Sequence, residues 1–326
     1  MRPLKTAVGT YGHTRPLKEG RIVPEGVTLE FVEVNPMIAA YRKMVRRLEY
    51  DVCEVAVTTY LVAKSFDKGF TALPIPLNHM FHFGDVQVGV DTGIGEPKDL
   101  VGKRVGVRAY TVTTGVWVRG ILEREYGVDP GSITWITDDE EHVTEYQAPP
   151  NVVPSGGVSL VDLFQEGKID AAFSGPAGLG RTGAPREGWD KGAVGMAAVR
   201  TTRDFRPLFP EAAQLDAAWF KRTGIYPIHG VVCVKDELLA AHPELPGRLF
   251  DAFTRAKELY LAELAANGPR SADDEKWTAL QAIVGPDPLP FGLEANRCTI
   301  EALIDYAHSQ GLIPKRYRPE DVFVPI

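Results

Sequence analysis

The sequence predicts an α/β protein of two lobes, each a doubly wound sheet, with a ligand cleft between them. Three observations predict this fold class. The 326 residues exceed one average domain, and about 150 residues per domain gives a prior of two. Short β-rich runs alternate with helical stretches, which is typical of a mostly parallel sheet. One such series is interrupted by another and later resumes, so we expect residues 1–84 and 205–326 to form lobe 1 and residues 85–204 to form an inserted lobe 2.

The first lobe is expected to begin with strands and one amphipathic helix. Apolar residues recur at helical spacing from Ile38 to Leu48, and Asn35-Pro36 opens that helix. The other elements follow from β-rich runs bounded by turn residues. The predicted strands are residues 4–9, 27–34, 50–57 and 72–76, and a second helix begins at about Thr58.

The same patterns predict the elements of the second lobe and of the segment that returns the chain to the first lobe. Gly127 predicts the end of a helix over residues 113–126, because glycine accepts the left-handed conformation that closes a helix. The predicted strands are residues 85–91, 104–108, 132–137, 169–173 and 194–199, with a helix at 161–167 and a loop at 149–157. The return to the first lobe is a strand at 231–234, followed by helices at 246–266, 273–284 and 296–310.

Composition and charge exclude several classes of partner. Hydrophobic residues make up 44% and charged residues 24%, which is ordinary for a soluble globular protein. The net charge of -7 does not favour nucleic acid, and the basic pairs Arg42-Lys43 and Arg46-Arg47 fit the solvated face of one helix. No apolar run approaches the roughly 20 residues that span a bilayer. We therefore expect a small-molecule ligand and neither a nucleic acid nor a membrane partner; the oligomeric state stays open, homo-oligomers included.

The cysteines and the first residues of the sequence indicate the cellular compartment in which the protein is expected. Cys53, Cys233 and Cys298 are odd in number and widely spaced, which fits neither a disulfide framework nor a zinc site. The first three residues run directly into a predicted strand, with no signal-peptide pattern before it. The expectation is a cytoplasmic protein, or a periplasmic one if a leader has been trimmed from this sequence.

Several segments, taken together and in order, resemble a known family. The stretch DLVGKRVGV at 99–107 is typical of the start of the second lobe in solute-binding proteins, and its extension YTVTTGVWVRGIL at 110–122, closed by EYGV at 125–128, is more specific. With YDVCE at 50–54, Ile75-Pro76, LFP at 208–210 and TGIYPIH at 223–229, the pattern covers nearly the whole chain and resembles the 4,5-dihydroxyphthalate decarboxylase family.

The resemblance implies a type II periplasmic-binding-protein-like clamshell that works as a cytoplasmic carboxy-lyase in aromatic compound catabolism, without a cofactor. A small aromatic carboxylate such as 4,5-dihydroxyphthalate would be the substrate. A phenol para to the leaving carboxylate pushes electrons to the ring carbon, a protonated group delivers a proton there, and carbon dioxide leaves. The rival interpretation is a non-catalytic solute-binding protein of an ABC-type uptake system, or a sensor, for a small carboxylate.

Three histidines are the candidate proton donors. His79 and His82 lie in LNHMFHF at 77–83, where the family pattern has arginines and an Arg-His pair, and His229 stands one residue earlier than in the family's Pro-Ile-X-His. On a regular strand that shift reverses the face of the side chain. Histidine exchanges a proton near neutral pH. One alternative is that these histidines only pack in the hinge. Another is that they form a metal site with Glu54, although their spacing matches no metal motif.

A candidate anion site follows the strand that ends at Arg108. Tyr110 and the hydroxyls of Thr113 and Thr114 stand at the start of the next helix, where free backbone N–H groups favour a carboxylate. Arg108 would add a charged contact. The alternative is an ordinary helix cap with a surface arginine.

Four further residues are candidate ligand contacts. Glu54 lies inside an apolar run, where a carboxylate needs a partner or a raised pKa. Thr58 follows it at a helix start, again a possible place for an anion. Tyr11 and His13 occupy the loop after the first strand, a usual ligand-contact position in this fold.

Overall fold

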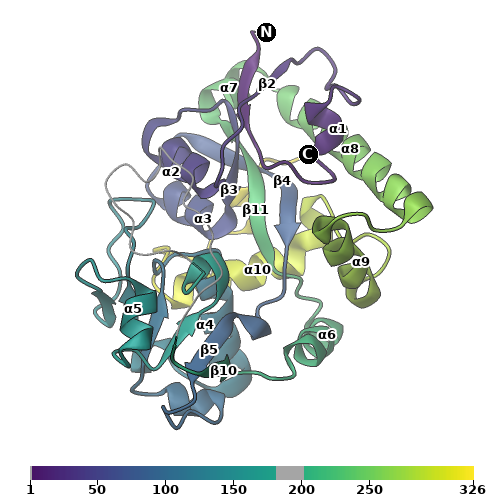
Figure 1. The fold of residues 1–326 in the computed structure, drawn as a ribbon. Coiled ribbons are helices and arrows are strands. Elements are labelled where there is room, and N and C mark those ends of the chain that lie inside the picture. Colours follow the sequence, from purple (N-terminus) through teal and green to yellow (C-terminus); the bar gives the residue numbers. More distant parts are fainter. Residues whose placement is uncertain (1, 181–201) are drawn as a thin grey trace. The chain divides into compact units, whose positions relative to one another are not determined.

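Two sheets organise the chain in the computed structural model, which describes residues 2–180 and 202–326 (Figure 1). The first unit comprises Met1–Met80, Thr223–Glu301 and Tyr317–Ile326, and the second comprises Phe81–Arg222 and Ala302–Arg316. The predicted strand at 194–199 lies outside the described residues. In the part of the chain that the structure describes, no helix is both long and apolar enough to span a bilayer.

The sheet of the first unit has five strands in the order β2-β1-β3-β11-β4. β1 is parallel to β2 and β3, and β11 is antiparallel to both β3 and β4. β1, β3 and β4 therefore run in one direction, and their carboxyl ends share one edge of the sheet. The strands are β1 (Leu4–Ala7), β2 (Leu29–Phe31), β3 (Val52–Ala56), β4 (Phe70–His79) and β11 (Ile228–Lys235).

β4 is longer than the sequence predicted. The strand expected at 72–76 continues to His79 despite Pro74 and Pro76. Proline is tolerated in edge strands, where one side of the backbone needs no ladder hydrogen bond, and β4 is an edge strand. The continuation is what makes His79 a residue of the sheet edge rather than of a loop.

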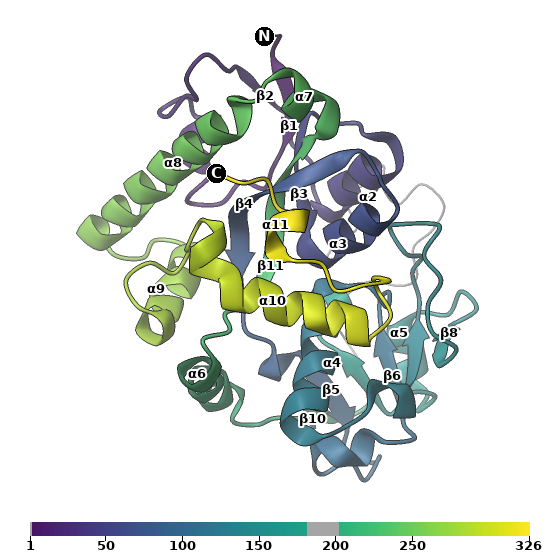
Figure 2. The same ribbon diagram turned by 180° about the vertical axis from the view of Figure 1, so that it is seen from behind.

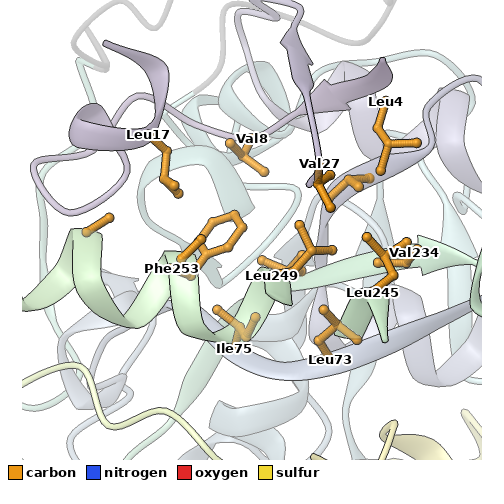
Figure 3. Packing of buried hydrophobic residues seen from close by; sticks show 14 of the residues in the cluster. Leu4, Val8, Leu17, Val27, Leu73, Ile75, Val234, Leu245, Leu249 and Phe253 are labelled. Carbon is orange, nitrogen blue, oxygen red and sulfur yellow. The ribbon is translucent and has the colours of Figure 1, made fainter. Parts of the chain in front are cut away.

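Helices cover both faces of this sheet. α8 lies along one face, while α2 and α3 lie on the other (Figure 1). In Figure 3, Leu249 and Phe253 of α8 pack with Leu73 and Ile75 of β4. Burial of each such side chain stabilises the fold by roughly 1.5–3 kcal/mol. The helices are α1 (Arg15–Lys18), α2 (Ile38–Arg47), α3 (Val57–Ser65), α7 (Asp236–Ala241), α8 (Leu245–Asn267), α9 (Ala272–Val284), α10 (Leu293–Ser309), whose last residues count with the second unit, and α11 (Pro319–Val322).

The pairing of β11 with β4 is irregular at the carboxyl edge. Ile228 pairs with His79 and Gly230 with Asn78, so two steps along β11 match one step along β4. Such a bulge interrupts the alternation of side chains between the two faces of a sheet. The rule of strict alternation, on which the expected orientation of His229 rested, therefore does not apply at this residue.

The second unit has a six-stranded sheet in the order β10-β5-β9-β6-β7-β8. β9, β6, β7 and β8 are parallel, and β5 and β10 complete one edge in antiparallel fashion. The segment expected as a loop at 149–157 contains β8, because its backbone pairs with β7. The elements are β5 (Val86–Gly89), β6 (Arg104–Val107), α4 (Thr113–Tyr126), β7 (Thr134–Thr137), β8 (Val152–Pro154), α5 (Leu160–Gln165), β9 (Ala171–Phe173), β10 (Phe205–Pro207) and α6 (Ala212–Thr223).

α4 has the bounds that the sequence predicted. It ends at Gly127, whose φ of 65° is left-handed, as expected for a glycine that closes a helix. Within the helix, Gly120 lets Tyr306 of α10 approach the backbone, and the Tyr306 ring also meets Trp117 edge-on at 5.7 Å. The glycine therefore serves helix packing.

Substituting Gly120 with alanine should destabilise the second unit. A Cβ at this position would stand 2.1 Å from the Tyr306 ring, and the ring is almost fully buried. Overpacking of this kind typically lowers the free energy of unfolding by about 1–3 kcal/mol. Urea denaturation measures the loss. Gly247→Ala is the matched control, because nothing lies within 4 Å of a Cβ there; equal stability of the two variants would contradict the prediction.

Candidate functional site

The carboxyl edge of the first unit's sheet gathers five of the predicted site residues. Tyr11 and His13 follow β1, Glu54 lies near the end of β3, and His79 ends β4. His229, the second residue of β11, is half-buried at the bulge beside them. Ligands of open α/β sheets bind outside the carboxyl ends of the strands, so this edge is the natural candidate site.

Glu54 is the anchor of this edge. Its carboxylate is 1% exposed and accepts hydrogen bonds from the Gly9 N–H at 2.9 Å, the Tyr11 hydroxyl at 2.9 Å and the Tyr41 hydroxyl at 3.0 Å. Burial raises the pKa of Glu54, while these donors act in the opposite direction. A Cβ on Gly230 would stand 2.8 Å from the carboxylate, so the glycine leaves room for Glu54. The partners of the buried carboxylate are thus two tyrosines and the backbone.

His13 continues the cluster from Tyr11. The two rings are stacked with centroids 5.4 Å apart, and the His13 ring meets Trp277 of α9 edge-on at 5.8 Å. His13 and Trp277 are each 1% exposed, and within the described residues the Trp277 indole N–H has no hydrogen-bond partner. The Leu77 backbone acts on the His13 ring, which leaves at least one of its two nitrogens without a partner there. Burial and the nearby Lys276 ammonium lower the pKa of His13 to about 3, so its ring is neutral at pH 7.

His79 is fixed in one tautomer. Its Nδ1 lies 3.2 Å from the carbonyl oxygen of Tyr226, and the two rings are stacked at 4.3 Å. Because a carbonyl oxygen only accepts, Nδ1 carries the proton and Nε2 presents a lone pair. Nε2 is buried and has no partner within the described residues. Burial lowers the pKa of His79 to about 3, so at pH 7 the neutral ring is a hydrogen-bond acceptor at Nε2.

Lys276 brings a positive charge to the same cluster. It comes from α9, which lies near the end of β4 (Figure 2), and its ammonium donates a hydrogen bond to the Asn78 side chain. The ammonium also lies 4.3 Å from the centre of the Trp277 ring. Burial lowers the pKa of Lys276 to about 8, and the charges of Asp273 and Glu54 oppose that shift.

His82 belongs to the second unit. Its Nδ1 lies 2.7 Å from Asp85 Oδ2, and the carboxylate of Asp216 accepts the neighbouring Phe83 N–H at 3.3 Å. Burial raises the pKa of Asp216 to about 6. His82 is therefore held by a carboxylate of its own unit, and its predicted role as a proton donor stays a prediction, as does that of His229.

The predicted anion site also lies in the second unit. Arg108 follows β6, and its Nη1 lies 3.2 Å from Asp139 Oδ2. Just before α4, the backbone N–H groups of Tyr110 and Thr111 donate to the carboxylate of Glu141, at 2.6 Å and 3.3 Å. A carboxylate does lie at this segment, but it belongs to the chain itself. Thr113 and Thr114 are buried in the first turn of α4, and Thr58 is buried in the first turn of α3 in the first unit.

Removing the Glu141 carboxylate should destabilise the second unit. Glu141→Ala leaves the buried Tyr110 and Thr111 donors without this acceptor, and an unsatisfied buried donor lowers stability by about 1–3 kcal/mol. Urea denaturation monitored by circular dichroism gives the change. The exposed Glu258 on α8 supplies the control substitution. A Glu141→Ala protein as stable as Glu258→Ala would show that the carboxylate contributes nothing.

The side chains that a metal site would require do not converge. Within residues 2–180 and 202–326, no group of three or more His, Cys, Asp or Glu side chains could hold a metal ion. Glu54 accepts from tyrosines and a backbone N–H, and His82 pairs with Asp85 in the other unit.

Several functional candidates were not anticipated from the sequence. Lys276 and Trp277 lie in the helix predicted at 273–284, where no motif marks them. Tyr41 lies in the predicted amphipathic helix and Tyr226 in the stretch TGIYPIH, and neither is a predicted site residue. A charged residue next to a tryptophan gives no signal until the fold brings both to the sheet edge. Glu141 lies in a stretch of acidic residues that reads as solvated loop.

Solved structures show which fold the chain adopts. The chain is similar to the sulfonate-binding protein SsuA of Methylobacillus flagellatus, with a TM-score of 0.54, 12% identity and coverage of 100% of this chain and 92% of that one. A desulfurization enzyme, DSZB, gives a TM-score of 0.52 at 14% identity over 99% and 97% of the two chains. The predicted α/β fold of the periplasmic-binding-protein type is thereby confirmed. No family model matches the sequence.

Two curated relatives carry the comparison further. A 4,5-dihydroxyphthalate decarboxylase of Comamonas testosteroni is 29% identical over 331 residues, which cover 99% of this chain and 96% of the relative. A protein of the same name from Pseudomonas putida is 30% identical over 179 residues, covering 52% of this chain and 69% of that protein. This chain belongs to the 4,5-dihydroxyphthalate decarboxylase family.

Proposed function

We propose that the protein is a carboxy-lyase that removes carbon dioxide from a small aromatic carboxylate such as 4,5-dihydroxyphthalate. The observation that carries the proposal is the similarity to the decarboxylase of Comamonas testosteroni along 99% of the chain. The proposal includes a cytoplasmic location and a reaction without a cofactor. Its substrate combines carboxylates with phenol hydroxyls, and the first unit's sheet edge holds groups suited to both.

The chemistry of such a step makes three demands on the protein. An acceptor must take up the proton of the phenol para to the leaving carboxylate, because the phenolate pushes electrons onto the ring carbon. A proton must then reach that carbon. The bond to the carboxylate breaks, its electron pair restores the aromatic ring, and carbon dioxide leaves. The acceptor then returns its proton to the phenolate. The product keeps one carboxylate and both hydroxyls, and the net change is the exchange of carbon dioxide for a proton.

His79 is the predicted histidine whose contacts best support a role. Its Nε2 is a buried lone pair held in place by the Tyr226 carbonyl, which suits the acceptor of a hydrogen bond from the phenol hydroxyl. The Tyr11 hydroxyl is held by a hydrogen bond to Glu54, and the His13 ring stacks on the Tyr11 ring. Transfer of the proton to the ring carbon remains assigned to the predicted set of His79, His82 and His229. Carboxylate binding at Arg108, Thr113 and Thr114 likewise remains a prediction.

The direct test is turnover by the purified protein. With 4,5-dihydroxyphthalate and no added metal or cofactor, we expect release of carbon dioxide and of 3,4-dihydroxybenzoate, both followed against a sample without enzyme. Absence of both products would contradict the proposal. If carboxylates then still raised the melting temperature, the remaining interpretation would be a solute-binding protein.

A further inference from the structure

Lys276 differs in its contacts from Lys257, a buried lysine of the first unit. Lys257 on α8 donates to Asp287 at 2.7 Å and to the Leu289 carbonyl at 2.9 Å, as a buried ammonium usually does. Among the described residues, the ammonium of Lys276 has one hydrogen-bond partner, the uncharged side chain of Asn78, and no carboxylate within ion-pair distance. A half-buried cation with no carboxylate within ion-pair distance suits an anionic ligand, although the charges of Asp273 and Glu54 also act on it.

A second observation points to the same place. His13, His79 and Trp277 are each at most 1% exposed, and each has a ring nitrogen without a hydrogen-bond partner within the described residues. These three residues lie near Lys276. Its ammonium lies over the Trp277 ring, and its charge acts on both histidines. Buried polar groups nearly always have partners, so several unpartnered ones around one cation indicate a ligand rather than a packing feature.

The groups differ in what they can bind. The ammonium of Lys276 and the indole N–H of Trp277 donate, which suits the oxygens of a carboxylate. Nε2 of His79 accepts, which suits a hydroxyl. A cation on the leaving carboxylate would stabilise the charge that must be lost with carbon dioxide, and would thus oppose the reaction. A cation on the neighbouring carboxylate has no such cost.

We propose that Lys276 binds the carboxylate that the substrate retains, and so selects an aromatic acid that also carries a hydroxyl for His79. This inference rests on the proposed function for the identity of the substrate. It assigns to α9 the recognition of the carboxylate in the first unit.

The test compares Lys276→Met with Lys276→Arg, which keeps the charge, and with Lys257→Met as a control for loss of a buried lysine. Affinities are measured by calorimetry for 3,4-dihydroxybenzoate, which has a carboxylate, and for catechol, which has none. We expect Lys276→Met to weaken 3,4-dihydroxybenzoate binding and to raise the KM for 4,5-dihydroxyphthalate, each by about 10- to 100-fold. Catechol binding should stay unchanged, and Lys276→Arg should recover part of the loss.

Three outcomes would overturn the inference. They are an unchanged affinity for 3,4-dihydroxybenzoate in Lys276→Met, an equal loss for catechol, or no binding of either compound by the wild type. The calorimetric comparison does not depend on turnover. A wild type that binds 3,4-dihydroxybenzoate through Lys276 but releases no carbon dioxide would therefore contradict the proposed function and leave the assignment of Lys276 intact.

The pH dependence gives an independent readout. With the pKa of Lys276 at about 8, the ammonium is lost as the pH rises, so the affinity for 3,4-dihydroxybenzoate should fall above about pH 8. The charged and titratable groups that act on this cluster are Asp273 of α9, Glu54 of β3, His13, His79 of β4 and Lys257 of α8. Of these, the two histidines are neutral well below pH 8. Lys276→Arg should remove the fall, and a fall that persists in this variant would assign it to another group.

Discussion

Replacing His79 with asparagine is expected to lower kcat by about 100- to 10,000-fold, the range that general acid–base groups contribute. The asparagine amide keeps a donor toward the Tyr226 carbonyl but lacks the lone pair that Nε2 presents. The local structure should therefore survive while the hydrogen-bond acceptor for the phenol hydroxyl is lost. Steady-state kinetics of carbon dioxide release measure the effect, and the melting temperature should stay near that of the wild type.

The other histidines supply the comparison for this prediction. His242, partly exposed at the end of α7, is the matched control, and His242→Asn should leave kcat unchanged. His82→Asn and His229→Asn complete the set of predicted proton donors. If turnover were unchanged in the variants of His79, His82 and His229 alike, none of the three would transfer a proton in the reaction.

Replacing Glu54 with alanine is expected to lower the free energy of unfolding by about 3 kcal/mol or more and to abolish most of the activity. The substitution leaves the Gly9 N–H and the Tyr11 and Tyr41 hydroxyls without their common acceptor. Loss of a hydrogen-bond acceptor lowers stability by about 1–3 kcal/mol for a buried donor. Tyr41 is buried, and Gly9 and Tyr11 are partly buried. We expect the activity to fall as well, because the Tyr11 ring is then no longer held in place. The His13 ring stacks on it. Urea denaturation with linear extrapolation, run beside the kinetics, measures both effects.

Glu54→Gln separates the two contributions of this residue. Glutamine keeps an oxygen acceptor without a charge, so stability should recover partly. Because burial raises the pKa of Glu54, the stability from its neutral form is greatest below the ordinary carboxyl pKa and is lost as the pH rises through the raised value. Glu54→Gln should lack that dependence. Glu30→Ala, on an exposed position of β2, is the control; an equal loss of stability in Glu30→Ala and Glu54→Ala would contradict the prediction.

The parts of the structure that sequence reasoning reached are those set by local patterns. The bounds of α4 follow from its periodicity and from Gly127, and the α/β class follows from the alternation of strands and helices. β4 was underestimated because its prolines read as an end, and only its place at the edge of the sheet explains why they are tolerated. That place depends on pairing with β11, which no local pattern discloses.

The residues of the candidate site likewise fall into those that a local pattern predicts and those that only the fold brings together. Glu54 was predicted because a carboxylate in an apolar run is anomalous by itself, and the structure supplies its partners. Lys276 was not predicted because its contact with Asn78 joins segments 198 residues apart in the chain. The bulge at Gly230 likewise depends on the register between two distant strands, so the orientation of His229 was beyond a rule of alternation.

The order of strands in the first sheet has a consequence for synthesis on the ribosome. In the sheet β3 and β4 lie on either side of β11, which begins at Ile228, whereas β3 and β4 are complete by His79. About 150 residues must therefore emerge before these two strands gain their shared neighbour, at roughly 5–20 residues per second. During those seconds the edges of β3 and β4 that will face β11 lack their partner, and unpaired strand edges of this kind favour aggregation. The edge that carries Glu54 and His79 is assembled only after most of the second unit has been translated.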